Sequence, residues 1–196
     1  ALYHSIGRGH LFVNHPDRWD KSINMSEVFV AVQTGKYLSI SPQKNNIVFS
    51  HMTVVFSMTD HAFFANLNST FHAVWTAKYA AKLKNDLRYL PTDCFETFPL
   101  VEESGTLSDL GQEFQTQRSK CMQELDLGLT KLYNQFHSTT SNHVCIQSLR
   151  DIQKRLDTAV ARSYGWLDLD LNHDFHEVGY LPENDRVRFT ISEDAR

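Results

Sequence analysis

The stretch that decides the fold is residues 27–40, which read EVFVAVQTGKYLSI. The first six are largely β-branched and apolar, a Thr-Gly pair follows, and the last five return to a mixed apolar pattern. Two such runs around a glycine-containing turn predict a β-hairpin with strands at 27–32 and 36–40. A polar loop at 41–46 and a third apolar run at 47–57 follow, so a small twisted sheet is expected.

The hydrophobic spacing changes after residue 59. Apolar and aromatic residues then recur at three- and four-residue steps, which predicts a helix from a cap at Thr59 or Asp60 to about Leu83. The residues that set this period are Phe64, Leu67, Phe71, Val74, Trp75 and Lys78. Pro91 and Pro99 bracket a non-helical stretch that is expected to link the two halves of the chain.

The second half of the chain is expected to be mainly helical. Thr106 and Asp109 have the spacing of a capping box for a helix that reaches Leu125. Further helices are predicted at 130–136 and 143–163, the latter ended by Gly165, and a half-buried strand at 186–192. The apolar stripes of the two long helices, Phe114/Cys121/Leu125 and Ile146/Leu149/Ile152/Leu156, are expected to pack on each other.

Together these patterns predict an α+β fold in two parts. Residues 1–100 would form a small twisted β-sheet with a buttressing helix. Residues 101–196 would form a mainly helical subdomain closed by a strand.

Charge is divided unevenly along the chain. Residues 1–90 hold 9 Lys/Arg against 5 Asp/Glu, whereas residues 91–196 hold 10 against 18, which gives the net charge of −4. Affinity for a polyanion depends mainly on Lys and Arg that neutralise phosphates, so only the first half is a plausible DNA-facing surface. The alternative is that both charge blocks are merely solvated faces.

Other features narrow the class of protein. No apolar run approaches the roughly 18 residues of a transmembrane helix, so no membrane partner is expected. The chain lacks a signal-peptide pattern and an initiator Met, which indicates a cytoplasmic fragment of a longer polypeptide. Its three cysteines, Cys94, Cys121 and Cys145, lack metal-like pairing and are expected to be reduced thiols.

The sequence offers weak evidence for chemistry within the chain. His173, His176 and Glu177 are ligand-type residues, and a metal-dependent hydrolase built on them is one alternative. A three-residue step does not align two imidazoles as a zincin helix does, so a surface loop and no metal site are predicted. The sequence contains no nucleophile elbow, P-loop or Asn-Pro-Pro-Tyr element, and no catalytic residue is assigned.

A basic stretch at residues 78–89 indicates DNA contact. Lys78 and Lys82 stand four apart and are predicted to share a helix face, with Lys84 and Arg88 following at the helix end. Lysines suit phosphate contacts, whereas Arg, Asn and Asp can pair with base edges in the major groove. The alternative is a solvated helix end whose cations complement the helix dipole.

Residues 83–89 and 93–99 resemble a signature of large adenine-N6 DNA methyltransferases, which include single-chain type IIG restriction-modification enzymes and related phage-defence methylases. Residues 65–75 are similar to that family's Leu-x-Ser-x-x-His-x-x-Trp helix. Further similar blocks are residues 128–134, 146–150, 156–160, 163–169 and 188–192. The resemblance runs from about residue 50 to the end, and residues 100–103 depart from it by replacing a further proline.

The resemblance implies that this chain is the DNA sequence-recognition segment of such an enzyme. In that family an N-terminal methyltransferase domain of the same polypeptide binds S-adenosylmethionine, and it would flip and methylate the base that this chain helps to position. The chain itself would hold no cofactor, and its partners would be double-stranded DNA and that domain. A helical protein-interaction module with no DNA role is the rival interpretation.

The expected DNA contacts fall into two groups. Four lysines would position phosphates, and six further residues would face base edges, because the resemblance places contacting residues near 84–88. The phosphate group is Lys36, Lys44, Lys78 and Lys82, and the base-edge group is Asn45, Asn46, Lys84, Asn85, Asp86 and Arg88.

Overall fold

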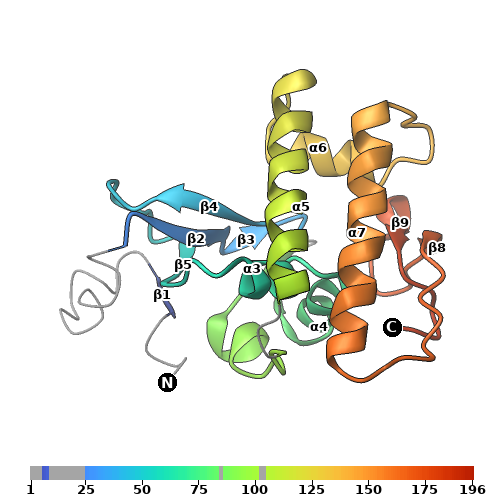
Figure 1. The fold of residues 1–196 in the computed structure, drawn as a ribbon, viewed down its shortest axis with the longest axis horizontal. Coiled ribbons are helices and arrows are strands. Elements are labelled where there is room, and N and C mark those ends of the chain that lie inside the picture. Colours follow the sequence, from blue (N-terminus) through green and yellow to red (C-terminus); the bar gives the residue numbers. More distant parts are fainter. Residues whose placement is uncertain (1–5, 9–24, 84–85, 102–104) are drawn as a thin grey trace. The chain divides into compact units, whose positions relative to one another are not determined.

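The computed structural model describes residues 6–8, 25–83, 86–101 and 105–196 (Figure 1). Its helices and small antiparallel sheets confirm the predicted α+β class. The chain forms two compact units. The first unit comprises residues 1–60 and 75–99, and the second comprises residues 61–74 and 100–196. In the described part of the chain, no helix combines the length and the apolar character needed to span a membrane.

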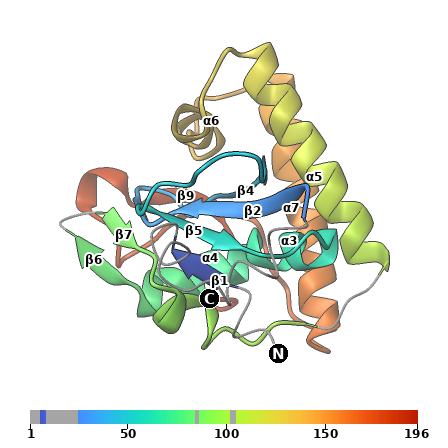
Figure 2. The same ribbon diagram turned by 90° about the vertical axis from the view of Figure 1, so that its left-hand side faces the viewer.

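A four-stranded antiparallel sheet forms the centre of the first unit (Figure 2). Its strands lie in the order β1 (Ile6–Arg8), β5 (Thr53–Phe56), β2 (Glu27–Val32) and β4 (Ile40–Lys44). The central strand β2 is covered on both faces, since residues 28–31 are all buried. This explains why its sequence is an almost continuous apolar run.

The two faces of this sheet have different cover. Val28, Val30 and Val55 form one apolar cluster, against which Met25 and Phe49 pack. On the other face, the Phe56 ring contacts those of Phe95 and Tyr89, with centroids 5.5 and 6.2 Å apart. Phe95 ends a short π-helical turn, Pro91–Phe95, which begins at the proline that cannot extend a strand.

The predicted return strand of the hairpin is wrong. Besides β5, the partner of β2 is β4, which begins at the last residue of the expected strand and continues through residues 41–44 of the expected loop. It pairs Ala31 with Ile40 and Glu27 with Lys44. Residues 34–35 form a separate strand, β3 (Thr34–Gly35), because they pair with β7 (Asp86–Arg88) instead. Pro42 is tolerated in β4 because β4 is an edge strand.

The single helix predicted to reach Leu83 is also wrong. The structure has α3 (His61–Leu67), α4 (Thr70–Tyr79) and then a strand, β6 (Ala81–Leu83), paired with β7. The break falls at Ser69, whose hydroxyl accepts a hydrogen bond from the backbone N–H of His72 (3.3 Å) and so caps a new helix. Residues 61–74, expected to buttress the sheet, belong to the second unit.

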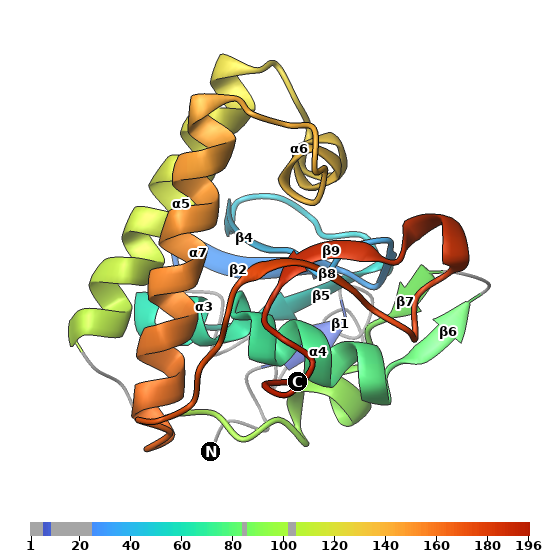
Figure 3. The same cartoon turned by 90° about the vertical axis from the view of Figure 1, so that its right-hand side faces the viewer.

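Helices form most of the second unit (Figure 3). After α3 and the first part of α4 come α5 (Gly105–Glu124), α6 (Leu129–Phe136) and α7 (Val144–Ser163), which confirms the three helices predicted in the second half of the chain. The long helices α5 and α7 lie side by side, and the Cys121 thiol of α5 donates to the Cys145 carbonyl of α7 (2.9 Å). Gly165, at φ +79°, follows the end of α7 as expected.

A two-stranded sheet completes the second unit. The predicted strand is β9 (Val187–Thr190), and a 3₁₀ turn, Glu183–Asp185, precedes it. The surface loop predicted around His173 is wrong, because β8 (Asp174–Glu177) pairs with β9. The Phe175 and Phe189 rings, directly opposite in register and 5.6 Å apart, stabilise that pairing.

A buried carboxylate anchors the start of α4 within the second unit. Asp157 of α7 is fully buried. It accepts hydrogen bonds from the Thr70 backbone N–H (2.7 Å) and hydroxyl (2.6 Å) and from the Gln153 amide (3.0 Å). Nε2 of His173 lies 2.8 Å from Oδ2, the oxygen that also accepts from the Thr70 hydroxyl. The negative charge at the first turn of α4 complements the helix dipole there.

Candidate nucleic-acid interface

The three-stranded sheet of the first unit presents the charged residues of the predicted recognition stretch. Its order is β3-β7-β6, and β7 is the central strand. Asp86 and Arg88 are exposed and Leu87 is half-buried, so the alternation of the strand puts the two charged side chains on one face. Thr34 and Ala81 flank Arg88 in register, and such short side chains leave its guanidinium uncovered.

The C-terminal end of α4 leads into this sheet and carries a lysine beside aromatic rings. Lys78 is exposed, and its Nζ lies 5.5 Å from the centroid of the Tyr79 ring. Tyr79 in turn packs against Trp75, with centroids 4.5 Å apart. The Trp75 indole N–H donates to the Thr97 hydroxyl (3.1 Å), which fixes the ring. These contacts hold the two aromatic rings in place beside the Lys78 ammonium group.

A second lysine has a similar setting on the other edge of the same sheet. Lys36 directly follows β3 and is exposed, and its Nζ lies 5.1 Å from the centroid of the Tyr37 ring. Lys36, Lys78 and Arg88 thus come from three segments that the small sheet brings together. Their roles as DNA contacts remain predictions.

The remaining predicted contacts lie at the far end of β4. Lys44 is exposed and stands opposite Glu27, four residues and therefore roughly 13 Å along the strand from Ile40. The Asn45 side chain is half-buried and donates to the Met25 carbonyl (3.2 Å). This hydrogen bond joins the segment after β4 to the segment before β2. Asn46 is exposed.

One prediction about the basic stretch is wrong, and another concerns residues outside the described part of the chain. Lys78 and Lys82 do not share a helix face, because α4 ends at Tyr79 and Lys82 belongs to β6. Lys84 and Asn85 lie outside the described residues. The contact between Trp75 and Tyr79 was missed, although their four-residue spacing beside Lys78 is visible in the sequence.

The compact units refine the charge asymmetry found along the chain. The first unit has 9 Lys/Arg against 7 Asp/Glu, a balance of +2, and the second has 10 against 16, a balance of −6. The first unit therefore keeps the positive balance of the first half of the chain, and the second unit keeps the negative balance of the second half. The excess in the first unit is small, so local placement around the small sheet matters more than net charge.

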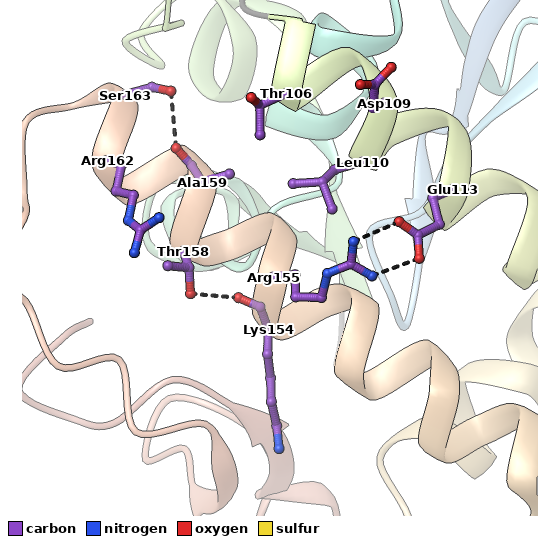
Figure 4. A pocket seen from close by; sticks show the side chains of 10 residues that line it. All are labelled: Thr106, Asp109, Leu110, Glu113, Lys154, Arg155, Thr158, Ala159, Arg162 and Ser163. Carbon is purple, nitrogen blue, oxygen red and sulfur yellow. Dashed lines mark hydrogen bonds and ion pairs between the residues drawn. The ribbon is translucent and has the colours of Figure 1, made fainter.

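A groove of about 740 Å³ between α5 and α7 is a second candidate site (Figure 4). Arg155 and Glu113 form a bidentate ion pair at its surface, with N–O distances of 2.7 and 2.9 Å. The hydroxyls of Thr158 and Ser163 donate to carbonyls of their own helix. The lining residues include no histidine or cysteine, so the groove offers no activated nucleophile.

The histidines considered as metal ligands are held by different partners. Nε2 of His173 lies against Asp157, as described above, whereas Nε2 of His176 lies 2.7 Å from the Asn172 carbonyl. The structure therefore gives no convergent ligand set at these two imidazoles.

Comparison with known proteins finds a family match in the first part of the chain. Residues 7–102 match the family described as MmeI, target recognition domain. A solved structure of the type IIL restriction-modification enzyme MmeI in complex with DNA is similar in fold, with a TM-score of 0.61 and 20% sequence identity. The alignment covers 74% of this chain and 19% of that chain, so this chain spans about a fifth of that enzyme. None of the curated proteins matches.

These matches confirm the resemblance to the target-recognition region of restriction-modification enzymes. The family match begins at residue 7, so it includes most of the first fifty residues, for which the sequence resemblance is weakest.

Proposed function

We propose, on the premise that residues 7–102 are a target recognition domain of the MmeI family, that this chain reads a DNA sequence for a restriction-modification enzyme. The observation that carries the proposal is that this matched segment also builds the small sheet with Asp86, Arg88, Lys36 and Lys78 around it. The helical protein-interaction alternative has no comparable support.

The geometry suits readout in the major groove. A two-stranded β-ribbon fits that groove, and β6 and β7 form an antiparallel pair that β3 extends by only two residues. Asp86 and Arg88 are two residues apart, roughly 6.6 Å, which is close to the rise of two base steps. Arg88 would donate to the O6 and N7 atoms of a guanine, and Asp86 would accept from the N4 amine of a cytosine.

The lysines would have a different role. Lys36 and Lys78 would bind phosphates beside the groove, which fixes the register of the ribbon without contributing to sequence choice. Tyr37 and Tyr79 limit the movement of these side chains through the ring contacts described above.

We assign the methyl transfer to the longer enzyme of which this chain would be the recognition segment. An N-terminal domain of the same polypeptide would bind S-adenosylmethionine and transfer its methyl group to adenine N6 in DNA, in the cytoplasm and as part of phage defence. The resemblance at residues 83–89 and 93–99 supports this assignment. The present sequence lacks an Asn-Pro-Pro-Tyr element, so its own residues would only bind and orient the duplex.

The test is selection of binding sites from a randomised duplex library by the purified chain. We expect one short preferred sequence for the wild type. Arg88→Ala should relax one position of that sequence and weaken binding by about 1–3 kcal/mol. Lys131→Ala, an exposed lysine of α6 in the second unit, is the matched control and should leave the sequence unchanged.

Identical preferred sequences and affinities for the wild type, Arg88→Ala and Asp86→Ala would refute the assignment of β7 as the reading strand. Circular dichroism of each variant shows that the comparison is made between folded proteins.

A further inference from the structure

Three side chains with metal-binding atoms meet where α5 ends and α7 begins. Glu124 is the last residue of α5, His143 is the N-cap of α7, and Cys145 lies in the first turn of α7. One ligand atom from each lies within 4.8 Å of the others. Nδ1 of His143 is 3.1 Å from Sγ of Cys145, and Nε2 of His143 is 3.8 Å from a carboxylate oxygen of Glu124.

The surrounding helices hold this cluster in place. The Cys121 thiol and the Gln117 amide of α5 both donate to the carbonyl of Cys145, at 2.9 and 3.4 Å. The backbone N–H of Cys145 donates to Nδ1 of His143, which completes the helix cap in the absence of an ion; an ion bound through Nδ1 would replace this hydrogen bond. The first turn of α7 is thus fixed to the last turns of α5 before any ion binds, and pre-organised ligands lose little conformational entropy on binding.

The types of atom and their exposure indicate the class of ion. A thiolate sulfur, an imidazole nitrogen and a carboxylate oxygen are the ligands of Zn²⁺, whereas Mg²⁺ and Ca²⁺ prefer oxygen alone. Cys145 is 2% exposed, but the side chains of His143 and Glu124 are 44% and 43% exposed. An ion can therefore enter from solvent and bind to the buried sulfur of Cys145.

The nearby Cys121 is not expected to be a ligand. Its S–H is already donated to the backbone carbonyl of Cys145.

We propose that Glu124, His143 and Cys145 form a Zn²⁺ site that clamps the end of α5 to the start of α7, with water as the fourth ligand. Binding transfers the Cys145 thiol proton to solvent and forms a bond from the thiolate to the ion. The site lies wholly within the second unit. It is therefore independent of the DNA recognition proposed for the first unit.

The experiment is a titration of the metal-free, phosphine-reduced chain with Co²⁺ alone, followed by Zn²⁺. We expect saturation at one equivalent, a sulfur-to-cobalt charge-transfer absorption in the near ultraviolet, and loss of that absorption when Zn²⁺ displaces the cobalt. Cys145→Ala should abolish the charge-transfer absorption. Cys94→Ala, which removes a buried free thiol of the first unit, is the matched control and should keep it.

The other two ligands are tested by variants chosen to fold. His143→Asn removes the imidazole but retains a side chain that caps helices well. Glu124→Gln changes only an exposed carboxylate. Each should weaken Co²⁺ binding at least about tenfold, since even partners of metal ligands contribute that much. Absence of the charge-transfer absorption in the wild type, its persistence in Cys145→Ala, or unchanged affinity in Glu124→Gln would overturn the proposal.

Discussion

Asp157 is the residue on which several parts of the second unit depend. Its two carboxylate oxygens accept from Thr70 and Gln153, and one of them lies against His173. Side chains from α4, from α7 and from the residue just before β8 therefore meet at one buried charge. A buried carboxylate is stable only when its lone pairs are satisfied in this way. Resemblance to a known block marked residues 156–160, but the partners of Asp157 are distant in sequence and no periodicity indicates them.

Asp157→Asn should destabilise the protein by about 1–3 kcal/mol, because one oxygen becomes an NH₂ group that faces hydrogen-bond donors. The free energy of unfolding in urea measures the loss. Asp151→Asn, an exposed carboxylate on the same helix, is the control and should change it by under about 0.5 kcal/mol. Equal stabilities of the two variants would mean that the buried network contributes nothing.

The buried thiols give the protein a sensitivity to alkaline pH. Burial raises the pKa of Cys94 from 9.0 to about 11. Between these values the unfolded chain has lost a proton that the folded chain keeps, so stability falls as pH rises, by at most about 1.4 kcal/mol per pH unit for this thiol. Urea unfolding at pH 8 and pH 10 should show a smaller decline for Cys94→Ala than for the wild type. A parallel decline in both would exclude Cys94 as a source of the effect.

At the scale of secondary structure, the contact between α3 and α5 depends on one glycine. A Cβ placed on Gly111 would lie 2.1 Å from the His61 carbonyl oxygen and 3.3 Å from the Ala65 side chain. The backbone oxygen cannot move away as a flexible side chain would, so the two helices must separate if Gly111 is substituted.

Gly111→Ala should therefore cost about 1–3 kcal/mol of stability, although alanine is the better helix former. Gly105→Ala is the matched control, because a Cβ at this first residue of the same helix meets nothing within 4 Å. Thermal unfolding should give a lower Tm for the first variant only. Two variants as stable as the wild type would show that α3 can shift at no cost.

The elements that the sequence predicts well are those whose own pattern determines them. The helices α5 and α7 have long apolar stripes, and β9 alternates regularly. The errors occur where pairing with a segment distant in sequence determines the secondary structure. Residues 34–35 leave the hairpin to pair with β7, and residues 81–83 leave the helix to form β6. The candidate DNA-binding residues were found by charge and resemblance, whereas the Glu124 cluster depends on helix packing that spacing does not reveal.

At the scale of the whole molecule, the two units have net charges of opposite sign. The balance is +2 in the first unit and −6 in the second. A protein with this distribution should be attracted to DNA through a small number of local cations and not through a general positive field. The number of phosphates that it neutralises is therefore expected to be small and assignable to individual side chains.

This expectation can be measured through the salt dependence of binding. The slope of log K against log salt is about −0.9 for each neutralised phosphate, so Lys78→Ala should make it shallower by about 1 and weaken preferred and random duplexes alike. Lys131→Ala removes an equally exposed lysine from the second unit and should leave the slope unchanged. Fluorescence anisotropy at several salt concentrations gives both slopes. If both variants lower the slope equally, the attraction is diffuse, and the cations around the small sheet are not the phosphate-binding surface.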